Sequence, residues 1–453
     1  MNFLQNYARR IALFMRKCTF VKKIAIIKTD SYFSLTLRRL HTTQPILTTA
    51  MKLTLTLPVC GLVLAAAVAS CGGRNAGNGS DSATFGDMPV VAERVHTPDG
   101  GSLIVAHPEK SENVRDLRLS DLADNIKIVR LETSDASMTG EGMTWITGNR
   151  IIIFCDGEIK QFDLDGKYIG KIGARGNGPG EYYIAPYDIY ADSSAERIYL
   201  VSYSADNIIS YNYDGSFAGN IPLAQKMQKG CIKVDTEKRI VTAVAMCFEG
   251  TKAKMQVWTQ DFEGNTLSDI SKPWLEVPTD FSNELYSNIG GNAENFSYAL
   301  FRISGEPDSL YECDGSSLLP KFTIPTEKGE MRYYNKMGSL YVSSGFGSPR
   351  QVSENSYVIE PKTPFVVEPE NLRGGYCRLI LDCIGDVDAG TGWIYSKSPE
   401  YFILNTSPGT LAELIEKSIA ERGVSGDELT KLQDFQSTLS EDDNNIVIFG
   451  SWK

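Results

Sequence analysis

Apolar and polar residues alternate on both sides of Asp165-Gly166, and this arrangement returns three times along the chain. Apolar side chains are spaced for two strands around the turn: Ile159 and Phe162 before it, then Tyr168, Ile169 and Ile172. The pattern predicts a β-hairpin. Gly215, Gly264 and Gly315 take the same place in later segments, at intervals of 49, 49 and 51 residues. A repeat of this length with about four strands per unit predicts the blades of a β-propeller.

A second marker fixes the order of strands within each unit. Arg150, Arg197 and Arg239 are each followed by isoleucine and start an apolar strand after a polar turn. Each precedes the hairpin glycine of its own unit, by 16, 18 and 25 residues. One unit therefore consists of strand A, a polar turn, strand B from the Arg-Ile pair, a loop, strand C, the Asp-Gly-type turn and strand D. Four such antiparallel strands form one blade.

The length of the patterned region predicts six blades, although seven remain possible. Residues 126–452 correspond to about 6.5 units of the observed repeat. The strict alternation in Ile126–Leu131 suits an edge or closing strand, and Asn445–Trp452 is a lone strand at the other end. We expect Asn445–Trp452 to close the ring by pairing with the start of the domain. Two short helices are expected before it, at about 410–438, from helical spacing of Leu411, Leu414, Ile415 and Ile419 and of Leu429, Leu432 and Phe435.

The N-terminal segment carries a targeting signal. From Met51 the chain reads MKLTLTLPVCGLVLAAAVASCGG, with one lysine, a short apolar run and small residues before Cys71. This order closely resembles a bacterial lipoprotein signal, which implies a signal peptide at 51–70 and lipidation of Cys71. An ordinary secretory signal with a coincidental cysteine is the alternative.

The regions around this signal are assigned by composition. Residues 1–50 carry nine Lys/Arg and one acid, and a complete signal follows them, so we interpret them as an upstream extension from a mis-assigned start codon. Residues 71–95 are predicted to be a flexible tether, because the segment after Cys71 is rich in small polar residues. The propeller domain is then 96–453.

Charge and cysteine content narrow the partners. Removing residues 1–70 leaves 35 basic and 55 acidic residues, a net charge of about −20, which disfavours nucleic acid. The six remaining cysteines contain no C-x-x-C pair and no metal-binding spacing. We expect buried thiols, with an inter-strand disulfide as the alternative; the six are Cys155, Cys231, Cys247, Cys313, Cys377 and Cys383.

One corner of the chain carries a family resemblance. The segment GARGNGPGEYYIAPYDI follows the first hairpin, and its Asn177–Gly180 portion suits a type II turn. It resembles the G-x-x-G-x-G-P-G-x-[FY] corner of NHL-type propellers, and specifically that of six-bladed propeller lipoproteins of Gram-negative bacteria. The matching residues are Gly173, Gly176, Gly178, Pro179, Gly180, Glu181 and Tyr182. The corner does not recur along residues 225–400.

The residue types available argue against a histidine-based enzyme. The three histidines, His41, His96 and His107, all precede the first predicted blade strand. A Ser-His-Asp triad or a histidine-bound zinc site therefore cannot be built inside the predicted blades. A calcium-dependent, lactonase-like carboxylate site is the alternative, and its candidate ligands are Asp188, Asp206, Asn207 and Asp235.

Candidate binding residues lie where the blades present their loops. The B–C loops and the corners from strand D to the next strand A emerge on one face of a propeller. Arg175, Glu181 and Tyr182 on the corner, and Tyr203 and Asp206 in a B–C loop, are the ligand-binding candidates. A structural ion pair between Arg175 and Glu181 is the alternative for that pair. Exposed tyrosines, or Trp145, Trp258, Trp274 or Trp393, could stack on sugars or peptide side chains, although blade packing is their expected role.

Together these observations predict a non-enzymatic lipoprotein anchored in the outer membrane, whose propeller binds a protein or glycan and needs no cofactor. Gly72 after Cys71 favours the outer membrane over retention at the inner membrane, and a periplasmic or surface-facing orientation stays open. The alternative is a divalent-cation-dependent hydrolase or lyase with a carboxylate site, with Ca²⁺ in the channel. An accessory subunit of an outer-membrane assembly is a third hypothesis.

The predicted start and processing sites are tested by intact mass and N-terminal peptide analysis of the expressed protein. We expect a mature chain that begins at a diacylated Cys71. Any peptide from residues 1–50 in the processed protein would contradict translation from Met51.

Overall fold

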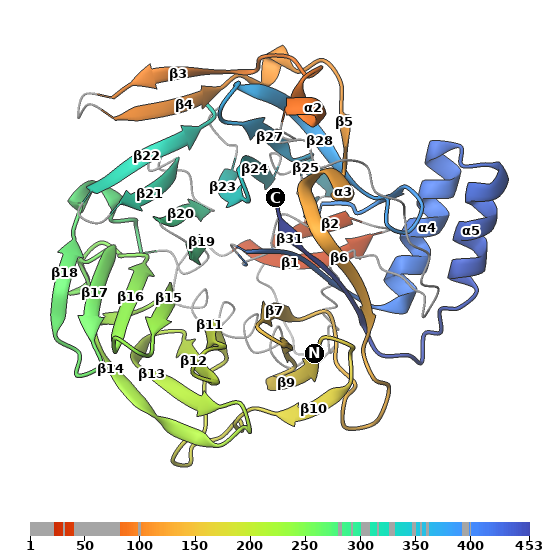
Figure 1. The fold of residues 1–453 in the computed structure, drawn as a ribbon. Helices are drawn as coiled ribbons and strands as arrows, with labels where there is room; N and C mark the ends of the chain where they lie inside the picture. The colour runs from red at the N-terminus through yellow and green to blue at the C-terminus, as the bar shows by residue number, and fades with distance from the viewer. Residues whose placement is uncertain are drawn as a thin grey trace.

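A computed structural model describes residues 22–29, 32–39, 82–97, 101–279, 283–290, 293–299, 309–314, 317–325, 331–346, 350–353, 356–358, 362–391, 398 and 400–453. Six β-sheets within these ranges stand around a common centre as the six blades of a β-propeller (Figure 1). The predicted fold class is confirmed, with six blades and not seven. The predictions for Cys71, Gly315, Trp393, His41 and residues 51–70 concern parts of the chain outside the described residues.

The first three blades follow the predicted order of strands A to D. Blade 1 comprises β7 (Met143–Thr147), β8 (Arg150–Cys155), β9 (Glu158–Asp163) and β10 (Tyr168–Lys171). Blade 2 comprises β11 (Pro186–Asp192), β12 (Arg197–Ser202), β13 (Ala205–Asn212) and β14 (Phe217–Met227). Blade 3 comprises β15 (Gly230–Asp235), β16 (Ile240–Ala245), β17 (Val257–Asp261) and β18 (Thr266–Ile270). The Arg-Ile pairs stand at or next to the start of the second strand, as predicted.

Blades 4 and 5 contain the same four strands and gain additional ones at their outer edges. Blade 4 comprises β19 (Glu284–Gly290), β20 (Ala293–Ala299), β21 (Leu310–Asp314) and β22 (Ser317–Thr323), extended by β4 (Ser102–Ala106) and β3 (Ala92–His96). Blade 5 comprises β23 (Met331–Met337), β24 (Leu340–Phe346), β27 (Phe365–Glu368) and β28 (Arg373–Leu381), extended by β29 (Val387–Asp388) and β5 (Arg115–Arg118). A small hairpin, β25 (Arg350–Ser353) and β26 (Ser356–Val358), is inserted between β24 and β27.

The sixth blade joins the two ends of the domain. It contains β30 (Tyr401–Thr406), β31 (Ile446–Trp452) and β6 (Ala123–Arg130) among the described residues, and β31 pairs antiparallel with both others. The predicted closing strand is confirmed, since Ile446 lies opposite Arg130 and Ile448 opposite Ile128. Ring closure thus joins strands separated by most of the domain.

An N-terminal strap, residues 82–130, runs along the outside of three successive blades. It adds β3 and β4 to blade 4, β5 to blade 5 and β6 to blade 6, and its pairings with β22 and β28 are parallel. The strap also includes the short helices α2 (Ser82–Phe85), η1 (Pro108–Lys110) and α3 (Leu119–Leu122).

The strap is part of the packed domain, which therefore begins before the predicted start at residue 96. Phe85, Met88 and Val91 are buried, so this part of the predicted tether 71–95 belongs to the core. Residues 71–81 lie outside the described residues. The hairpin of β1 (Lys22–Thr29) and β2 (Tyr32–Arg39) falls within the predicted upstream extension.

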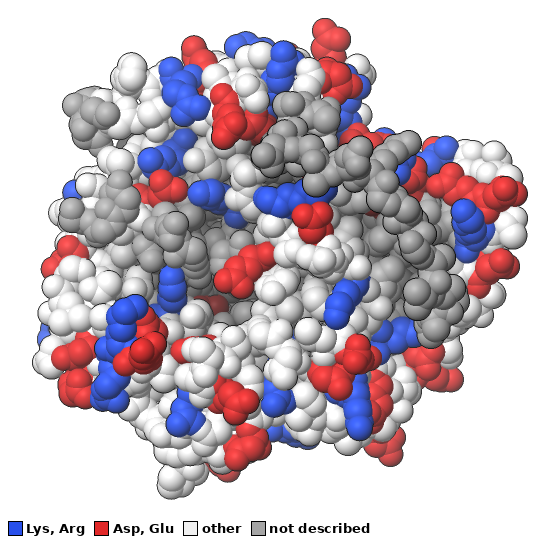
Figure 2. Space-filling model, in the orientation of Figure 1, with Lys and Arg blue, Asp and Glu red and all other residues white. Residues whose placement is uncertain are grey.

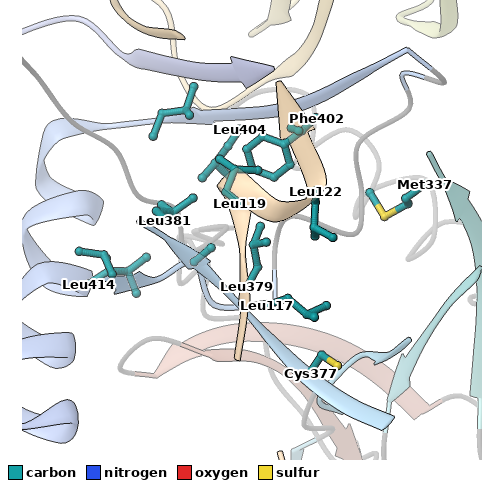
Figure 3. Close-up of a cluster of buried hydrophobic side chains, with 14 of the residues drawn as sticks. Leu117, Leu119, Leu122, Met337, Cys377, Leu379, Leu381, Phe402, Leu404 and Leu414 are labelled. Carbon is teal, nitrogen blue, oxygen red and sulfur yellow. The ribbon is translucent and has the colours of Figure 1, made fainter. Parts of the chain in front are cut away.

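The two predicted helices occupy the connection between β30 and β31. Helix α4 (Pro408–Arg422) begins at Ser407, whose side chain accepts a hydrogen bond from the backbone N–H of Thr410, and it ends at Gly423 in the left-handed region. Helix α5 (Gly426–Gln436) follows directly. Their apolar faces complete the core cluster in which the strap, blade 5 and blade 6 meet (Figure 3). Its labelled members come from all four regions: Leu117, Leu119, Leu122, Met337, Cys377, Leu379, Leu381, Phe402, Leu404 and Leu414.

The repeated turn glycine is explained by contact with the preceding blade. Gly166, Gly215 and Gly264 all have φ of +86° to +88°. A Cβ atom on Gly166 would overlap the carbonyl oxygen of Arg130, and one on Gly215 would lie 2.5 Å from that of Lys171. The turns of blades 1 and 2 therefore sit on the end of the previous blade's last strand, and the turn of blade 3 lies against Pro222 in the middle of β14. The same contact identifies β6 as the outermost strand of blade 6.

The predicted thiols are free, and their surroundings differ. All six described cysteines lack a disulfide; Cys231, Cys247, Cys313 and Cys377 are buried and Cys155 is half-buried. Cys383 is exposed, because β28 ends at Leu381 and Cys383 lies in the following turn. For Cys383 the expectation of a buried thiol is therefore wrong.

The blade contact of the turn glycine predicts a large cost for a side chain at Gly166. Gly166→Ala should lower the free energy of unfolding by about 2–4 kcal/mol, since it adds a backbone overlap to the strain of a positive φ. Gly250→Ala is the matched control, because Gly250 has φ +74° and open space around its Cβ position. It should cost about 1 kcal/mol. Equal losses in denaturant titrations of the two variants would contradict this account of the repeat.

Candidate functional site

The corners between blades lie directly on the B–C loops, which together define what we call the loop face. Tyr182 in the first corner donates a hydrogen bond from its hydroxyl to the carbonyl of Gly157, over 3.0 Å. The N–H of Ser204 in the B–C turn of blade 2 bonds the carbonyl of Gln228 in the next corner. In blade 3, the N–H of Val277 bonds the carbonyl of Cys247. The predicted arrangement of corners and B–C loops on one side is therefore present.

Glu181 closes the glycine-rich corner. Its carboxylate accepts a hydrogen bond of 2.7 Å from the backbone N–H of Gly178, and its own N–H bonds the carbonyl of Gly178. Gly180 has φ +78°, as the predicted type II turn requires. No ion pair joins Glu181 to Arg175 among the described residues, because the carboxylate points into the turn. Glu181 is thus a structural residue of the corner.

Tyr182 is buried beneath the loop face and packs against blade 2. Its side chain is 1% exposed, and its ring packs edge-on against Tyr211 with centroids 6.5 Å apart. Burial raises the pKa of its phenol well above the ordinary value. A ligand on the loop face would therefore meet Arg175, not Tyr182.

The other predicted residues divide between two blades. Arg175 is exposed and lies over the B–C turn of blade 1, where a Cβ atom on Gly157 would be 2.9 Å from its guanidinium. Tyr203 is half-buried and Asp206 exposed in the B–C region of blade 2, with Asp206 3.3 Å from Lys226. The structure brings Arg175 to the turn of blade 1 and leaves Tyr203 and Asp206 in a separate group.

A polar pocket of about 400 Å³ opens beside the turn of blade 1. It lies between the connection that follows β6 and the B–C turn, and its lining residues are Met138, Thr139, Gly140, Cys155, Asp156, Glu158 and Lys160. Asn444, just before the closing strand, fixes the connection: its side chain accepts from the N–H of Thr139 and donates to the carbonyls of Glu132 and Ser137. The sequence pattern gave no sign of the 138–140 wall, because it lies in an irregular connection.

Charged groups at this pocket are held in fixed positions. The ammonium of Lys160 donates to the carbonyl of Met138 and lies 3.5 Å from a carboxylate oxygen of Glu158. A hydrogen bond from Lys171 lowers the pKa of Glu158, so its carboxylate is ionised at neutral pH. Burial raises the pKa of the Cys155 thiol, which therefore stays protonated and a poor nucleophile. The pocket offers hydrogen bonding and charge, and it offers no activated thiol.

A buried charged cluster that sequence reasoning missed joins blades 2, 3 and 4. Lys229 is 1% exposed, and its ammonium donates to the carbonyl of Asn283 at 2.6 Å and to the carboxylate of Glu284 at 2.5 Å. The hydroxyl of Tyr187 donates to the other carboxylate oxygen of Glu284 at 2.8 Å, and Lys229 lies 5.8 Å from the centre of the Tyr187 ring. The cluster links three innermost strands and so has a structural role.

The carboxylates proposed as cation ligands are not brought together. Asp188 accepts a hydrogen bond from the N–H of Ile232, Asp206 pairs with Lys226, and Asp235 pairs with Lys238. Within the described ranges, no group of three or more His, Cys, Asp or Glu side chains could hold a metal ion.

The tryptophan candidates separate clearly by exposure. Trp145 and Trp258 are buried in the blades, as expected for blade packing. Trp274, in the corner between blades 3 and 4, is 55% exposed.

Two further properties concern membrane-spanning helices and the distribution of charge on the surface. In the part of the chain that the structure describes, no helix combines the length and the apolar character of a membrane span. Figure 2 shows one face of the ring, where acidic and basic side chains are interspersed and the surface is hollowed near its centre.

Comparisons with known proteins found a matching family model and similar crystal structures. A family model described as "Domain of unknown function (DUF4934)" matches residues 103–451. A crystal structure of a "putative exported protein" from Bacteroides fragilis NCTC 9343 has 14% identity and a TM-score of 0.48, covering 75% of this chain and 100% of its own. A member of the DUF4221 family from Bacteroides vulgatus ATCC 8482 has 10% identity and a TM-score of 0.41, covering 73% and 97%. No curated protein matches the chain.

The burial of Lys229 predicts unequal effects for two ion-paired lysines. Lys229→Met should lower the free energy of unfolding by about 3–5 kcal/mol, because it leaves the carboxylate of Glu284 without its buried cation. Lys226→Met removes the exposed pair with Asp206 and should cost less than about 1 kcal/mol. Denaturant titrations of both variants check this, and similar losses would show that the Lys229 cluster does not bind the three blades together.

Proposed function

We propose a function for this chain as a member of the family described as "Domain of unknown function (DUF4934)", to which it belongs over residues 103–451. It is a lipoprotein of the cell envelope that holds a protein or glycan partner on the loop face and performs no reaction on it. The observation that carries this proposal is the polar pocket beside the first corner, where charged groups of the B–C turn and of β9 line one opening together with the connection at residues 138–140.

The pocket is large enough to hold a ligand. Its volume falls within the range of about 300–1,000 Å³ found for ligand pockets. Its walls are held by backbone hydrogen bonds and by the Asn444 side chain, so a ligand would lose little affinity to ordering of the protein. The guanidinium of exposed Arg175 lies at the adjacent turn and adds a donor for carbonyl or hydroxyl groups.

The N-terminal signal supports the location. Cys71 follows an apolar segment and small residues, so we assign it as the lipidated residue of an outer-membrane lipoprotein. The corner motif supports placing the chain among NHL-like six-bladed propeller lipoproteins of Gram-negative bacteria. Cys71 lies eleven positions before the start of α2 at Ser82, and this length of chain spans at most roughly 40 Å when extended. The propeller would therefore work close to the membrane surface.

The rival hypothesis of a cation-dependent hydrolase or lyase needs three or four oxygen ligands that converge. Among the described residues, no group of three or more His, Cys, Asp or Glu side chains could hold a metal ion, and the candidate carboxylates of Asp206 and Asp235 pair with lysines. Metal analysis of the purified protein tests this rival directly: tightly bound stoichiometric calcium would favour it over the binding function.

The binding function predicts that partners contact one face of the anchored protein. A photo-crosslinking amino acid at Arg175 should give adducts in intact cells, because it sits beside the pocket. The matched control is the same amino acid at Glu237, which is exposed in the A–B turn of blade 3 on the opposite side. We expect at least a tenfold excess of adducts at Arg175.

The crosslinked products are resolved by mass spectrometry, which identifies protein and glycan adducts alike. Equal yields at the two positions, or adducts at Glu237 alone, would refute binding on the loop face. Cell fractionation of the same strains checks the anchor, since the wild-type chain should be recovered with the membrane.

A further inference from the structure

We propose that Trp274 is a stacking platform for a sugar ring, so that the ligand of the loop face is a neutral glycan. This inference rests on the proposed binding function and names the chemical class of its partner. Trp274 lies two blades away from the pocket, in the corner between β18 and β19, and forms a site of its own.

The indole of Trp274 is exposed on a turn that is held by hydrogen bonds and by a buried side chain. Trp274 is the middle residue of the 3-10 turn η2 (Pro273–Leu275), which is fixed by hydrogen bonds from Leu275 to Lys272 at 2.9 Å and from Glu276 to Pro273 at 3.1 Å. Leu275 is fully buried and anchors the turn in the core of blade 3. The indole packs against the buried ring of Tyr311 with centroids 5.8 Å apart, and more than half of its surface remains exposed.

The corner that carries Trp274 is docked onto the B–C loop of blade 3. Phe248 and Val277 form a parallel bridge, and the N–H of Glu249 bonds the carbonyl of Val277 at 2.9 Å. The hydroxyl of Thr279 donates to the carbonyl of Glu249 at 3.1 Å. These contacts place the corner that carries Trp274 on the loop face.

Fixed polar groups surround the turn. Glu276 pairs with the ammonium of Lys254 at 2.5 Å. The side chain of Gln256 bonds both backbone groups of Lys272, accepting from its N–H at 2.6 Å and donating to its carbonyl at 3.2 Å. Gln256 is fully buried and holds the backbone of the turn, whereas the Lys254–Glu276 pair beside the turn is within reach of a ligand, since the Lys254 side chain is 48% exposed.

A sugar ring matches this combination better than a protein surface does. An aromatic plane with a few polar groups at its edge suits a pyranose, which has an apolar C–H face and hydroxyls around its rim. A protein interface usually needs a contiguous apolar core, whereas Trp274 is the one exposed large apolar residue among the described residues of this corner. The predicted net charge of about −20 for residues 71–453 disfavours anionic glycans, so the sugar should be neutral.

Leu267 provides a matched control for this site. It is 57% exposed on β18 of the same blade, close to the exposure of Trp274, and it precedes the corner. Leu267→Ala removes an apolar side chain of similar exposure and leaves the residues of the corner unchanged.

The experiment titrates the full chain with maltohexaose, cellohexaose, mannohexaose and chitohexaose. Binding is followed by calorimetry and by quenching of tryptophan fluorescence with iodide. We expect at least one oligosaccharide to bind and to shield the accessible indole from iodide. Trp274→Ala should weaken that binding at least tenfold and Trp274→Phe by less, while Leu267→Ala leaves it unchanged. Thermal melts of the three variants confirm that they are folded.

The outcomes separate this inference from the proposed function. Oligosaccharide binding that Trp274→Ala leaves intact would refute the platform and retain a glycan-binding loop face. Absence of binding to all four oligosaccharides, with protein adducts at Arg175 in the crosslinking experiment, would refute the neutral glycan and retain a protein partner. Absence of both would overturn the proposed function itself.

Discussion

The pairing of β31 with β6 is the constraint on which the ring depends, because it joins segments more than 300 residues apart. Bringing the ends of such a long loop together costs about 5 kcal/mol of chain entropy. Val447 and Ile448 of β31 are fully buried against neighbouring elements, and each contributes about 1.5–3 kcal/mol. Two such side chains nearly offset closure, and the six residue pairs of the ladder add hydrogen bonds. The strap, which extends blades 4 and 5 through β4 and β5, secures the same seam from outside.

The seam also builds the pocket. The wall at residues 138–140 lies in the connection from β6 to β7, and Asn444, whose side chain accepts a hydrogen bond from Thr139, lies two positions before the start of β31. Both sides of the closing pair therefore contribute to the opening beside blade 1. A partially opened ring would lose the pocket together with the last blade, which couples the proposed binding site to the integrity of the fold.

The sequence alone predicted the turns and strands that depend on interactions between neighbouring residues. The Asp-Gly turn and the Arg-Ile pair have short-range causes, a positive φ and a strand start, and the strands they predicted in blades 1 to 3 are present. The strap was missed because its parallel pairings with β22 and β28 depend on partners about 200 or more residues away. Tyr182 was predicted on the surface because the corner is irregular and has no period from which burial can be inferred. Burial of Lys229 could not be predicted, because its partner Glu284 lies 55 residues away in the sequence.

The loop face is rigid for one physical reason that recurs around the ring. In blades 1, 2 and 3 the corner is tied to a B–C loop by a hydrogen bond to a backbone carbonyl, at Gly157, Gln228 and Cys247. A side chain displayed on such a corner pays little entropy on binding, so an exposed group there can contribute most of its contact energy to affinity. Selection could then change the ligand by replacing a displayed residue, such as Arg175 or Trp274, while the hydrogen bonds that carry the corner stay the same.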